Sequence, residues 1–350
     1  MWRATNVSRF MGASSVDDNF GTLYIHSNSP NCLVDGNGLF GSQGKNQTSH
    51  SMKKAYFSKF GSQAQLSSNV FWMIAIGLWI CLIDYIWILA GHWSFEIAHA
   101  RVVVLGICVP ALLLGFKRYR SDPKIFNACT SLIAILLFTN AAAVLSYLVV
   151  STNFPLVDYQ LDQIDKWMNF DWLSIYQWLQ IHPLIGLTLK VAYNSLLFQM
   201  VFVVIFLGFT NRFLELNQFV LMLMISALIT IVISGFFPAA GAWKYYSISE
   251  GVDLGALTHF ELLRSGALKT VDLIKTQGLI SIPSFHTVLA ILITYALRTS
   301  RIAFPLALVL NTAMLISIPT EGSHYLIDLL SGALLAVMTI WVVTRLIPSK

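Results

Sequence analysis

The sequence predicts an all-α membrane protein, a polytopic helical bundle with about eight spans. Hydrophobic residues make up 56% of the 350 residues, whereas charged residues make up only 11%. A soluble globular protein has roughly 25% charged residues. The composition therefore excludes an ordinary water-soluble domain, and the small net charge of +5 gives no reason to expect a nucleic-acid partner.

Eight uncharged or nearly uncharged runs are the expected spans. A helix needs about 20 apolar residues to cross a bilayer, with roughly 17 as the lower limit. The second run is shorter than this and contains Pro110, so it crosses only if Ala100 and Arg101 join it. The runs cover residues 70–89, 102–116, 125–150, 191–209, 219–237, 282–297, 302–318 and 325–343.

Basic residues at alternate connections predict the orientation of the spans. Lys and Arg precede the first run and follow the second, fourth, sixth and eighth runs. Because basic residues are enriched in cytoplasmic loops, both termini are expected in the cytoplasm. The outer side then receives residues 90–101, 151–190, 238–281 and 319–324. This agreement requires that the second run crosses.

The outer segment 156–181 has the composition of an interfacial helix. Acidic residues alternate there with apolar and aromatic ones, and they are Asp158, Asp162, Asp165 and Asp171. Such a helix would lie along the membrane surface. The alternative is a solvated loop with aromatic anchors.

The N-terminal residues 1–51 differ from the rest because they are polar, rich in Ser, Asn and Gly, and without lasting periodicity. This composition predicts disorder, so residues 1–68 are expected to form a cytoplasmic tail. Met52, followed by two lysines, is an alternative start. The stretch lacks the basic and apolar pattern of a signal peptide, which together with the basic loops fits a bacterial inner membrane.

Two histidine motifs stand where predicted spans begin on the outer side. The first is Ser-Ile-Pro-Ser-Phe-His-Thr at residues 281–287, and the second is Glu-Gly-Ser-His-Tyr-Leu-Ile-Asp at residues 321–328. Ionisable groups at the end of a membrane helix are costly to hold there, so they are candidates for function.

In the first motif, Pro283 and Ser284 predict a helix start. Proline is favoured in the first helical turn, and the free backbone N–H groups of that turn favour anions. His286 would then face an anion held at the helix start. The alternative is a helix N-cap followed by an incidental histidine.

In the second motif, the spacing of His324 and Asp328 predicts a paired imidazole and carboxylate. Residues four apart lie on one helical face, where the acid can fix the orientation and tautomer of the ring. The alternative is a structural His–Asp pair between helices. Two histidines on one side, one of them backed by an acid, indicate chemistry in which one attacks and the other donates a proton.

Polar residues also occur inside the fourth run. Tyr193, Asn194 and Gln199 share much of one helical side. They either line a headgroup pocket or, as the preferred interpretation, form hydrogen bonds between helices.

The ordered pair of histidine motifs resembles the type-2 phosphatidic acid phosphatase superfamily. That superfamily carries Lys-x6-Arg-Pro, then Pro-Ser-Gly-His, and then Ser-Arg-x5-His-x3-Asp. With Phe285 in place of the usual glycine, the pattern here is closest to the inositol phosphorylceramide synthase-like branch. The resemblance covers roughly residues 125–346 as a six-helix core, and residues 69–120 would be two additional spans.

The resemblance implies a role for each matching residue. His324 would be the nucleophile that forms a phosphohistidine, and Asp328 would orient it. His286 would protonate the leaving alkoxide, and Ser284 with the adjacent backbone would bind phosphate oxygens. The chemistry of this superfamily uses no metal and no cofactor.

The cations of the superfamily pattern are missing. The arginine six residues before the nucleophile falls on Ile318, and Lys-x6-Arg-Pro is absent. Phosphoryl transfer needs positive charge near the equatorial oxygens. The outer loop offers Lys244, Arg264, Lys269 and Lys275. Arg264 and Lys275 are preferred because they precede the first histidine motif at the expected interval, and each cation could instead be a solvated loop charge or a headgroup contact.

We therefore expect a metal-independent membrane enzyme that acts at the outer face on a lipid phosphate or a lipid headgroup phosphodiester. Water as acceptor would make it a lipid phosphatase, whereas a lipid alcohol would make it an inositol phosphorylceramide synthase-like phosphotransferase. A proton-coupled transporter is the alternative from another class, although no internal repeat typical of transporters is evident. A catalytically inactive lipid-binding relative is a further alternative, suggested by Ile318.

Overall fold

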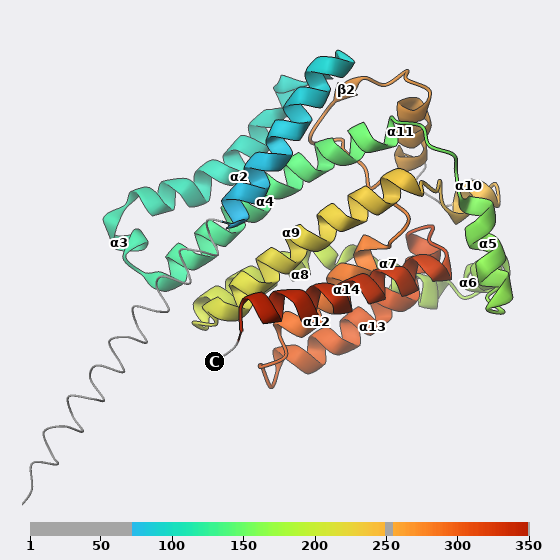
Figure 1. The fold of residues 1–350 in the computed structure, drawn as a ribbon. Coiled ribbons are helices and arrows are strands. Elements are labelled where there is room, and N and C mark those ends of the chain that lie inside the picture. Colours follow the sequence, from blue (N-terminus) through green and yellow to red (C-terminus); the bar gives the residue numbers. More distant parts are fainter. Residues whose placement is uncertain (1–71, 249–254, 349–350) are drawn as a thin grey trace, which may run out of the picture. The chain divides into compact units, whose positions relative to one another are not determined.

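The computed structural model describes residues 72–248 and 255–348, all within the compact unit Phe60–Lys350 (Figure 1). The predicted tail 1–68, with the alternative start at Met52, lies outside the described residues. Almost all regular structure is helical, so the predicted all-α bundle is confirmed.

Each predicted apolar run contains a helix. Among the described residues, α7 (Pro183–Asn194) and α8 (Leu196–Phe209) are bent by 44° and form one further span if counted together. Two apolar helical stretches are shorter, Arg101–Gly115 within α2 (Ile97–Gly115) and α12 (Phe285–Ala296). The five that are long and apolar enough to cross alone are Trp72–Gly91, α4 (Pro123–Val150), α9 (Phe213–Phe236), α13 (Ala303–Glu321) and α14 (Leu326–Leu346).

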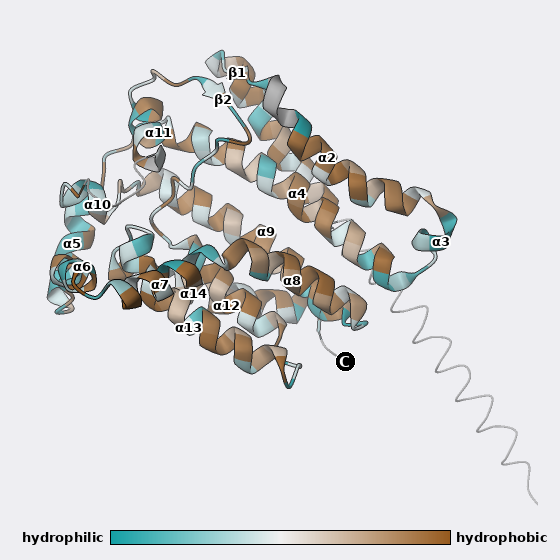
Figure 2. Ribbon diagram, turned by 180° about the vertical axis from the view of Figure 1, so that it is seen from behind, coloured by the Kyte–Doolittle hydropathy of each residue, from teal (hydrophilic) through white to brown (hydrophobic). Residues whose placement is uncertain are grey.

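Short polar elements connect these helices. Figure 2 shows hydrophilic residues at α3 (Lys117–Arg120) and, at the opposite end of the bundle, at α5 (Asp158–Trp167) and α6 (Trp172–Gln180). The parallel strands β1 (Ser94–Phe95) and β2 (Thr270–Val271) pair and so join two segments that the charge pattern placed on the same outer side. The remaining short helices are α10 (Ala242–Tyr245) and α11 (Gly255–Arg264).

The helix α9 is the centre of the bundle. It packs against α4, α8, α12 and α14, and side chains such as Phe219, Met222 and Leu223 are almost fully buried. A helix that is hydrophobic all round lies in a core or spans a membrane. This central position lets α12 and α14, which begin within the two histidine motifs, pack on the same helix.

The helices α12 and α14 approach each other closely at Gly332. A Cβ at this position would lie 2.5 Å from the Ser284 carbonyl oxygen and 3.1 Å from the Thr287 Cβ. The backbone N–H of Ser284 also donates to the carbonyl oxygen of Asp328 at 3.0 Å. Glycine at 332 therefore allows the two helix starts, and with them the two histidine motifs, to lie side by side.

Several basic residues that the sequence places on the cytoplasmic side meet at the other end of these helices. Arg212, after α8, donates to Thr299, after α12. Arg298 donates to the Gln218 side chain at 3.2 Å, and Gln218 donates to the Ile347 carbonyl oxygen at 2.7 Å. The α8–α9 and α12–α13 connections and the end of α14 are thus neighbours.

Candidate active site

The start of α12 is fixed by Ser284. Its hydroxyl accepts the Thr287 N–H at 3.5 Å, and its side chain is fully buried. A capping hydroxyl satisfies one of the free N–H groups at a helix start. The structure therefore gives Ser284 the N-cap position that the sequence left as an alternative, and Ser284 does not line the cavity described below.

The segment before α14 holds His324 against the end of α13. The chain turns through Gly322 and Ser323, and Ser323 has a φ of 58°. A Cβ on Gly322 would lie 2.7 Å from the His324 Cδ2 and 2.8 Å from the Ile318 carbonyl oxygen. A left-handed conformation costs a non-glycine residue about 1–2 kcal/mol, and such strained positions cluster at functional sites.

The carboxylate of Asp328 receives three hydrogen bonds on one oxygen. Its Oδ2 accepts from the Ser281 hydroxyl at 2.7 Å and from the Tyr325 N–H at 3.0 Å, and it lies 3.2 Å from the Nδ1 of His324. Because a carboxylate only accepts, the imidazole carries its proton on Nδ1 and keeps a lone pair on Nε2. The predicted imidazole–carboxylate contact is present, and both side chains are buried.

The two histidines line one cavity of about 320 Å³. Tyr193 of α7 stacks on His286, with ring centroids 4.4 Å apart, and lines the same cavity. Gly322 and His324 line it from the α13–α14 connection. The fold thus brings together side chains from both motifs and from α7. From the sequence, the preferred interpretation of Tyr193 was a structural hydrogen bond between helices.

The rest of this cavity is mostly apolar, although Thr139, Ser146, Thr230 and Gln277 also line it. Its walls come mainly from α4, α9 and α12 and include Phe138, Ala142, Leu223, Ile231 and Leu289. A mostly apolar chamber with a few polar groups at one place is typical of a small-molecule site. Here the two histidines and Tyr193 gather polar atoms at one place in the lining.

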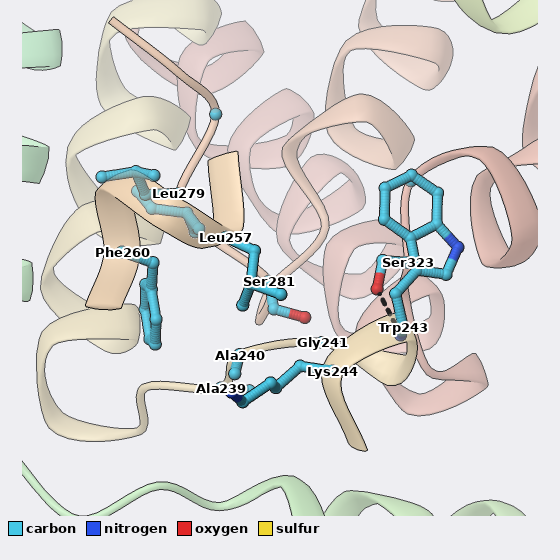
Figure 3. A pocket seen from close by; sticks show the side chains of 13 residues that line it. Ala239, Ala240, Gly241, Trp243, Lys244, Leu257, Phe260, Leu279, Ser281 and Ser323 are labelled. Carbon is cyan, nitrogen blue, oxygen red and sulfur yellow. Dashed lines mark hydrogen bonds between the residues drawn. The ribbon is translucent and has the colours of Figure 1, made fainter. Parts of the chain in front are cut away.

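A second, smaller cavity of about 80 Å³ adjoins the first (Figure 3). Lys244, Ser281 and Ser323 contribute polar side chains to it. The hydroxyl of Ser323 accepts the Trp243 N–H at 2.8 Å, and Lys244 forms an ion pair with Glu261. Both cavities are lined by Gly278, Leu279, Ile280 and Gly322.

Two of the predicted phosphate-binding cations lie elsewhere. Lys275 is 66% exposed and pairs with Asp272 at 3.7 Å. Lys269 is exposed and donates to the Gly91 carbonyl oxygen at 3.5 Å. Neither side chain lines the cavity that contains the histidines.

Arg264, the third predicted cation, lies closer to the site. Its guanidinium lies over the ring of Phe260 at 5.4 Å, and Phe260 lines the smaller cavity. Burial lowers the pKa of Arg264 from its ordinary value, and the charge of Asp158 opposes this shift. Its Nη1 is buried and has no hydrogen-bond partner within the described part of the chain.

Segment 156–181 forms α5 and α6, so the alternative of a solvated loop is wrong. Three of its four acids are buried, a feature that the alternation of acidic and apolar residues did not indicate. Asp158 accepts the N–H groups of Ala240 and Gly241, each at 2.9 Å, and the Tyr325 hydroxyl at 3.0 Å. Burial raises the pKa of Asp158, and these hydrogen bonds oppose the rise.

Sequence reasoning missed the role of Ser281. The residue begins the first histidine motif, but its hydroxyl meets an acid that lies 47 residues later in the chain. Only the packing of the α12 start against α14 creates this contact. The available signal in the sequence was the hydroxyl group of Ser281 itself, and a hydroxyl group does not identify its partner.

Within the described ranges, no cluster of three or more His, Cys, Asp or Glu side chains is placed to hold a metal ion.

Comparison with known families agrees with this arrangement of the two histidine motifs. Searches of curated proteins and of solved structures found no match. A family model for the PAP2 superfamily, the type-2 phosphatidic acid phosphatases, matches residues 159–342. Because this match covers more than half of the chain and includes both histidine motifs, the chain belongs to the PAP2 superfamily.

Proposed function

We propose that this chain is an integral membrane phosphoesterase that cleaves a lipid phosphate, or a lipid headgroup phosphodiester, through a phosphohistidine. The observation that carries the proposal is the single cavity that has both histidines in its lining and mostly apolar walls. A phosphoryl group beside the histidines would leave a hydrocarbon chain among Phe138, Leu223 and Ile231. The bundle interior would thus bind the lipid part of the substrate.

In the first half-reaction, the Nε2 of His324 attacks phosphorus, and the bond from phosphorus to the leaving oxygen breaks. Asp328, next to Nδ1, stabilises the positive charge that the imidazole gains. His286 gives its proton to the leaving alkoxide. The products are a phosphohistidine and a free alcohol, and the step needs no metal or cofactor.

In the second half-reaction, His286 takes a proton from the acceptor, whose oxygen attacks phosphorus and releases His324. Water as acceptor gives a lipid phosphatase. The alternative is transfer to a lipid alcohol, as in inositol phosphorylceramide synthesis. Phe285 favours this alternative because it lines the cavity beside His286, where a large apolar side chain hinders water.

Lys244 and Arg264 are the proposed sources of positive charge in place of the arginine that Ile318 replaces. Lys244 lines the cavity that adjoins the histidines, and its ion pair with Glu261 is half exposed and therefore exchangeable. Such charge stabilises the equatorial oxygens during phosphoryl transfer.

The proposed active site faces the outer side of a bacterial inner membrane, with both termini in the cytoplasm. The basic residues near Arg212 and Arg298, at the end of α12 away from His286, support this orientation. A lipid substrate would enter from the outer leaflet.

Turnover by purified protein in detergent–lipid micelles with a metal chelator tests the proposal. Phosphatidic acid and phosphatidylinositol serve as donors, with and without a ceramide acceptor. We expect His324→Ala to lower turnover at least about 10³-fold, since the nucleophile is lost. His182→Ala is the control, because the His182 ring contacts the Trp178 carbonyl oxygen and does not line the cavity. Turnover that survives in His324→Ala, or none with any donor, would favour the proton-coupled transporter.

A further inference from the structure

Asp165 caps the helix that carries Asp328. One of its carboxylate oxygens accepts the Leu326 N–H at 2.7 Å, and the other accepts the Ile327 N–H at 3.1 Å. These are the first two residues of α14, and N–H groups at this position have no partner within their own helix. Asp165 lies on α5, 161 residues earlier than Leu326, and is only 2% exposed.

Asp158 binds the residue directly after the nucleophile and the segment that contacts the residue before it. It lies two helical turns before Asp165, and therefore on the same face of α5. Its carboxylate binds the Tyr325 hydroxyl and the Gly241 N–H. Gly241 has a φ of 90°, and a Cβ there would lie 2.7 Å from the Ser323 hydroxyl oxygen. The next residue, Ala242, donates its N–H to the Ser323 carbonyl oxygen at 2.9 Å. Tyr325 is thus bound to α5 directly, and Ser323 through residues 241–242.

Asp162, between these two acids, ties α5 to α10 and the residue after it. It accepts from the Lys166 ammonium group at 2.7 Å, from the Tyr245 hydroxyl at 3.3 Å and from the Tyr246 hydroxyl. Burial alone would raise the pKa of Asp162, but these hydrogen bonds outweigh it and hold the pKa below its ordinary value. The middle acid therefore anchors α5 as a charged carboxylate.

We propose that Asp165 is a positioning residue for the nucleophile and acts through the first turn of α14. His324 and Asp328 each lie within two residues of Leu326, so a shift of this turn changes the contact between imidazole and carboxylate. An ionised carboxylate accepts both N–H bonds, whereas a protonated acid accepts less well on the oxygen that carries the proton. The inference rests on the proposed function, because it assigns the nucleophile to His324.

The charge of Asp165 changes in an accessible pH range. Burial raises its pKa to about 6, the N–H bonds from Leu326 and Ile327 oppose the rise, and the charges of Asp328 on α14 and Asp162 on α5 add to it. Lowering the pH through 6 therefore protonates Asp165 in the folded protein. Its hold on α14 should weaken over the same interval.

The kinetic test compares wild type with Asp165→Asn, which keeps the size of the side chain but only one acceptor oxygen. We expect kcat to fall about 10–100-fold at pH 8 with KM within about twofold, since displacing a catalytic group by about 1 Å can cost 10²-fold. The ratio of wild-type to variant kcat isolates Asp165, because both proteins share His286 and His324. This ratio should shrink as the pH falls from 7 to 5, and a ratio near one, or independent of pH, would overturn the proposal.

The control variant is Asp171→Asn, which changes an exposed acid that caps the neighbouring helix α6. Its kcat and its pH profile should match wild type. If Asp171→Asn reproduces the effect of Asp165→Asn, the effect is a general one of α5–α6 charge and the proposal fails.

Hydrogen–deuterium exchange separates this inference from the proposed function, because it needs no turnover. The amides of Leu326 and Ile327 should exchange faster in Asp165→Asn than in wild type and be unchanged in Asp171→Asn. Equal exchange in all three proteins would contradict the role of Asp165. Absence of His324-dependent turnover in wild type would overturn the proposed function, while the exchange result would still decide whether Asp165 holds α14.

Discussion

At the scale of single residues, Asp328 connects the two histidine motifs. Its Oδ2 accepts from Ser281 of the first motif, and it lies beside the Nδ1 of His324 in the second. Its other oxygen, Oδ1, is buried and without a hydrogen-bond partner among the residues described. One carboxylate oxygen therefore determines the tautomer of the imidazole and joins it to the segment before α12.

Asp328→Asn should abolish most turnover without unfolding the protein. The Asn amide can turn either its oxygen or its nitrogen toward His324. An amide nitrogen that faces Nδ1 stabilises the wrong tautomer of the imidazole. In a serine protease triad, the wrong tautomer costs about 10⁴-fold in kcat. We expect a loss of about 10²–10⁴-fold in kcat, measured by steady-state phosphate release.

Ser281→Ala is the control for this variant. It removes one of the three donors to Oδ2 and leaves the imidazole contact, so a loss below about tenfold is expected. Near-normal turnover in Asp328→Asn would show that the acid does not orient the nucleophile.

At the scale of helices, the close contact of α12 with α14 determines where the histidines meet. Gly332 is the point of approach, and a Cβ there would meet backbone atoms of Ser284, which cannot move as a flexible side chain can. The separation of His286 from His324 therefore depends on a glycine two turns into α14.

Gly332→Ala should lower kcat by at least about tenfold, because the added methyl group pushes the α12 start away from α14. Overpacking of this kind typically costs about 1–3 kcal/mol, so the midpoint of thermal unfolding should fall as well. Gly77→Ala is the matched control, since a Cβ at Gly77 meets no atom within 4 Å. Equal kcat in both variants would contradict the importance of this contact.

The sequence predicted the helices and both histidine motifs because apolar runs and i,i+4 spacing are local patterns. It did not predict the surroundings of Lys269 and Lys275, because their loop has no periodicity and is positioned by the pairing of β2 with β1. It also gave no sign that Asp158 and Asp165 are buried. Their partners belong to segments far along the chain, and only the fold brings them together.

At the scale of the whole molecule, the cavity is built from α4 onward. Its lining begins at Phe138 and ends at His324, and among the described side chains none from Trp72–Gly91 or α2 takes part. Yet Met73 and Ile80 of the first helix are buried in the same apolar core as α4 and α9. The first two helices should therefore matter for stability more than for chemistry.

A chain that begins at residue 122 should retain His324-dependent turnover. We expect kcat within about threefold of the full-length value and a lower midpoint of thermal unfolding, because the truncation exposes the surface that Met73 and Ile80 cover. Both are measured on purified protein in the same micelles. A folded but inactive truncation would mean that the two N-terminal helices belong to the catalytic core.

The measurement that addresses the chemistry most directly is the trapping of the phosphoenzyme. The test uses His286→Gln and a phosphate ester whose leaving group is an alkyl-substituted nitrophenolate. This leaving group departs without protonation, so the first half-reaction proceeds. The second half-reaction is slow, because the acceptor has lost the general base His286. A phosphohistidine should therefore accumulate, and rapid quenching in alkali followed by peptide mass spectrometry should place the phosphoryl group on His324. The double variant His286→Gln/His324→Ala should remain unlabelled. Label on another residue, or turnover without any labelled intermediate, would contradict the proposed role of His324.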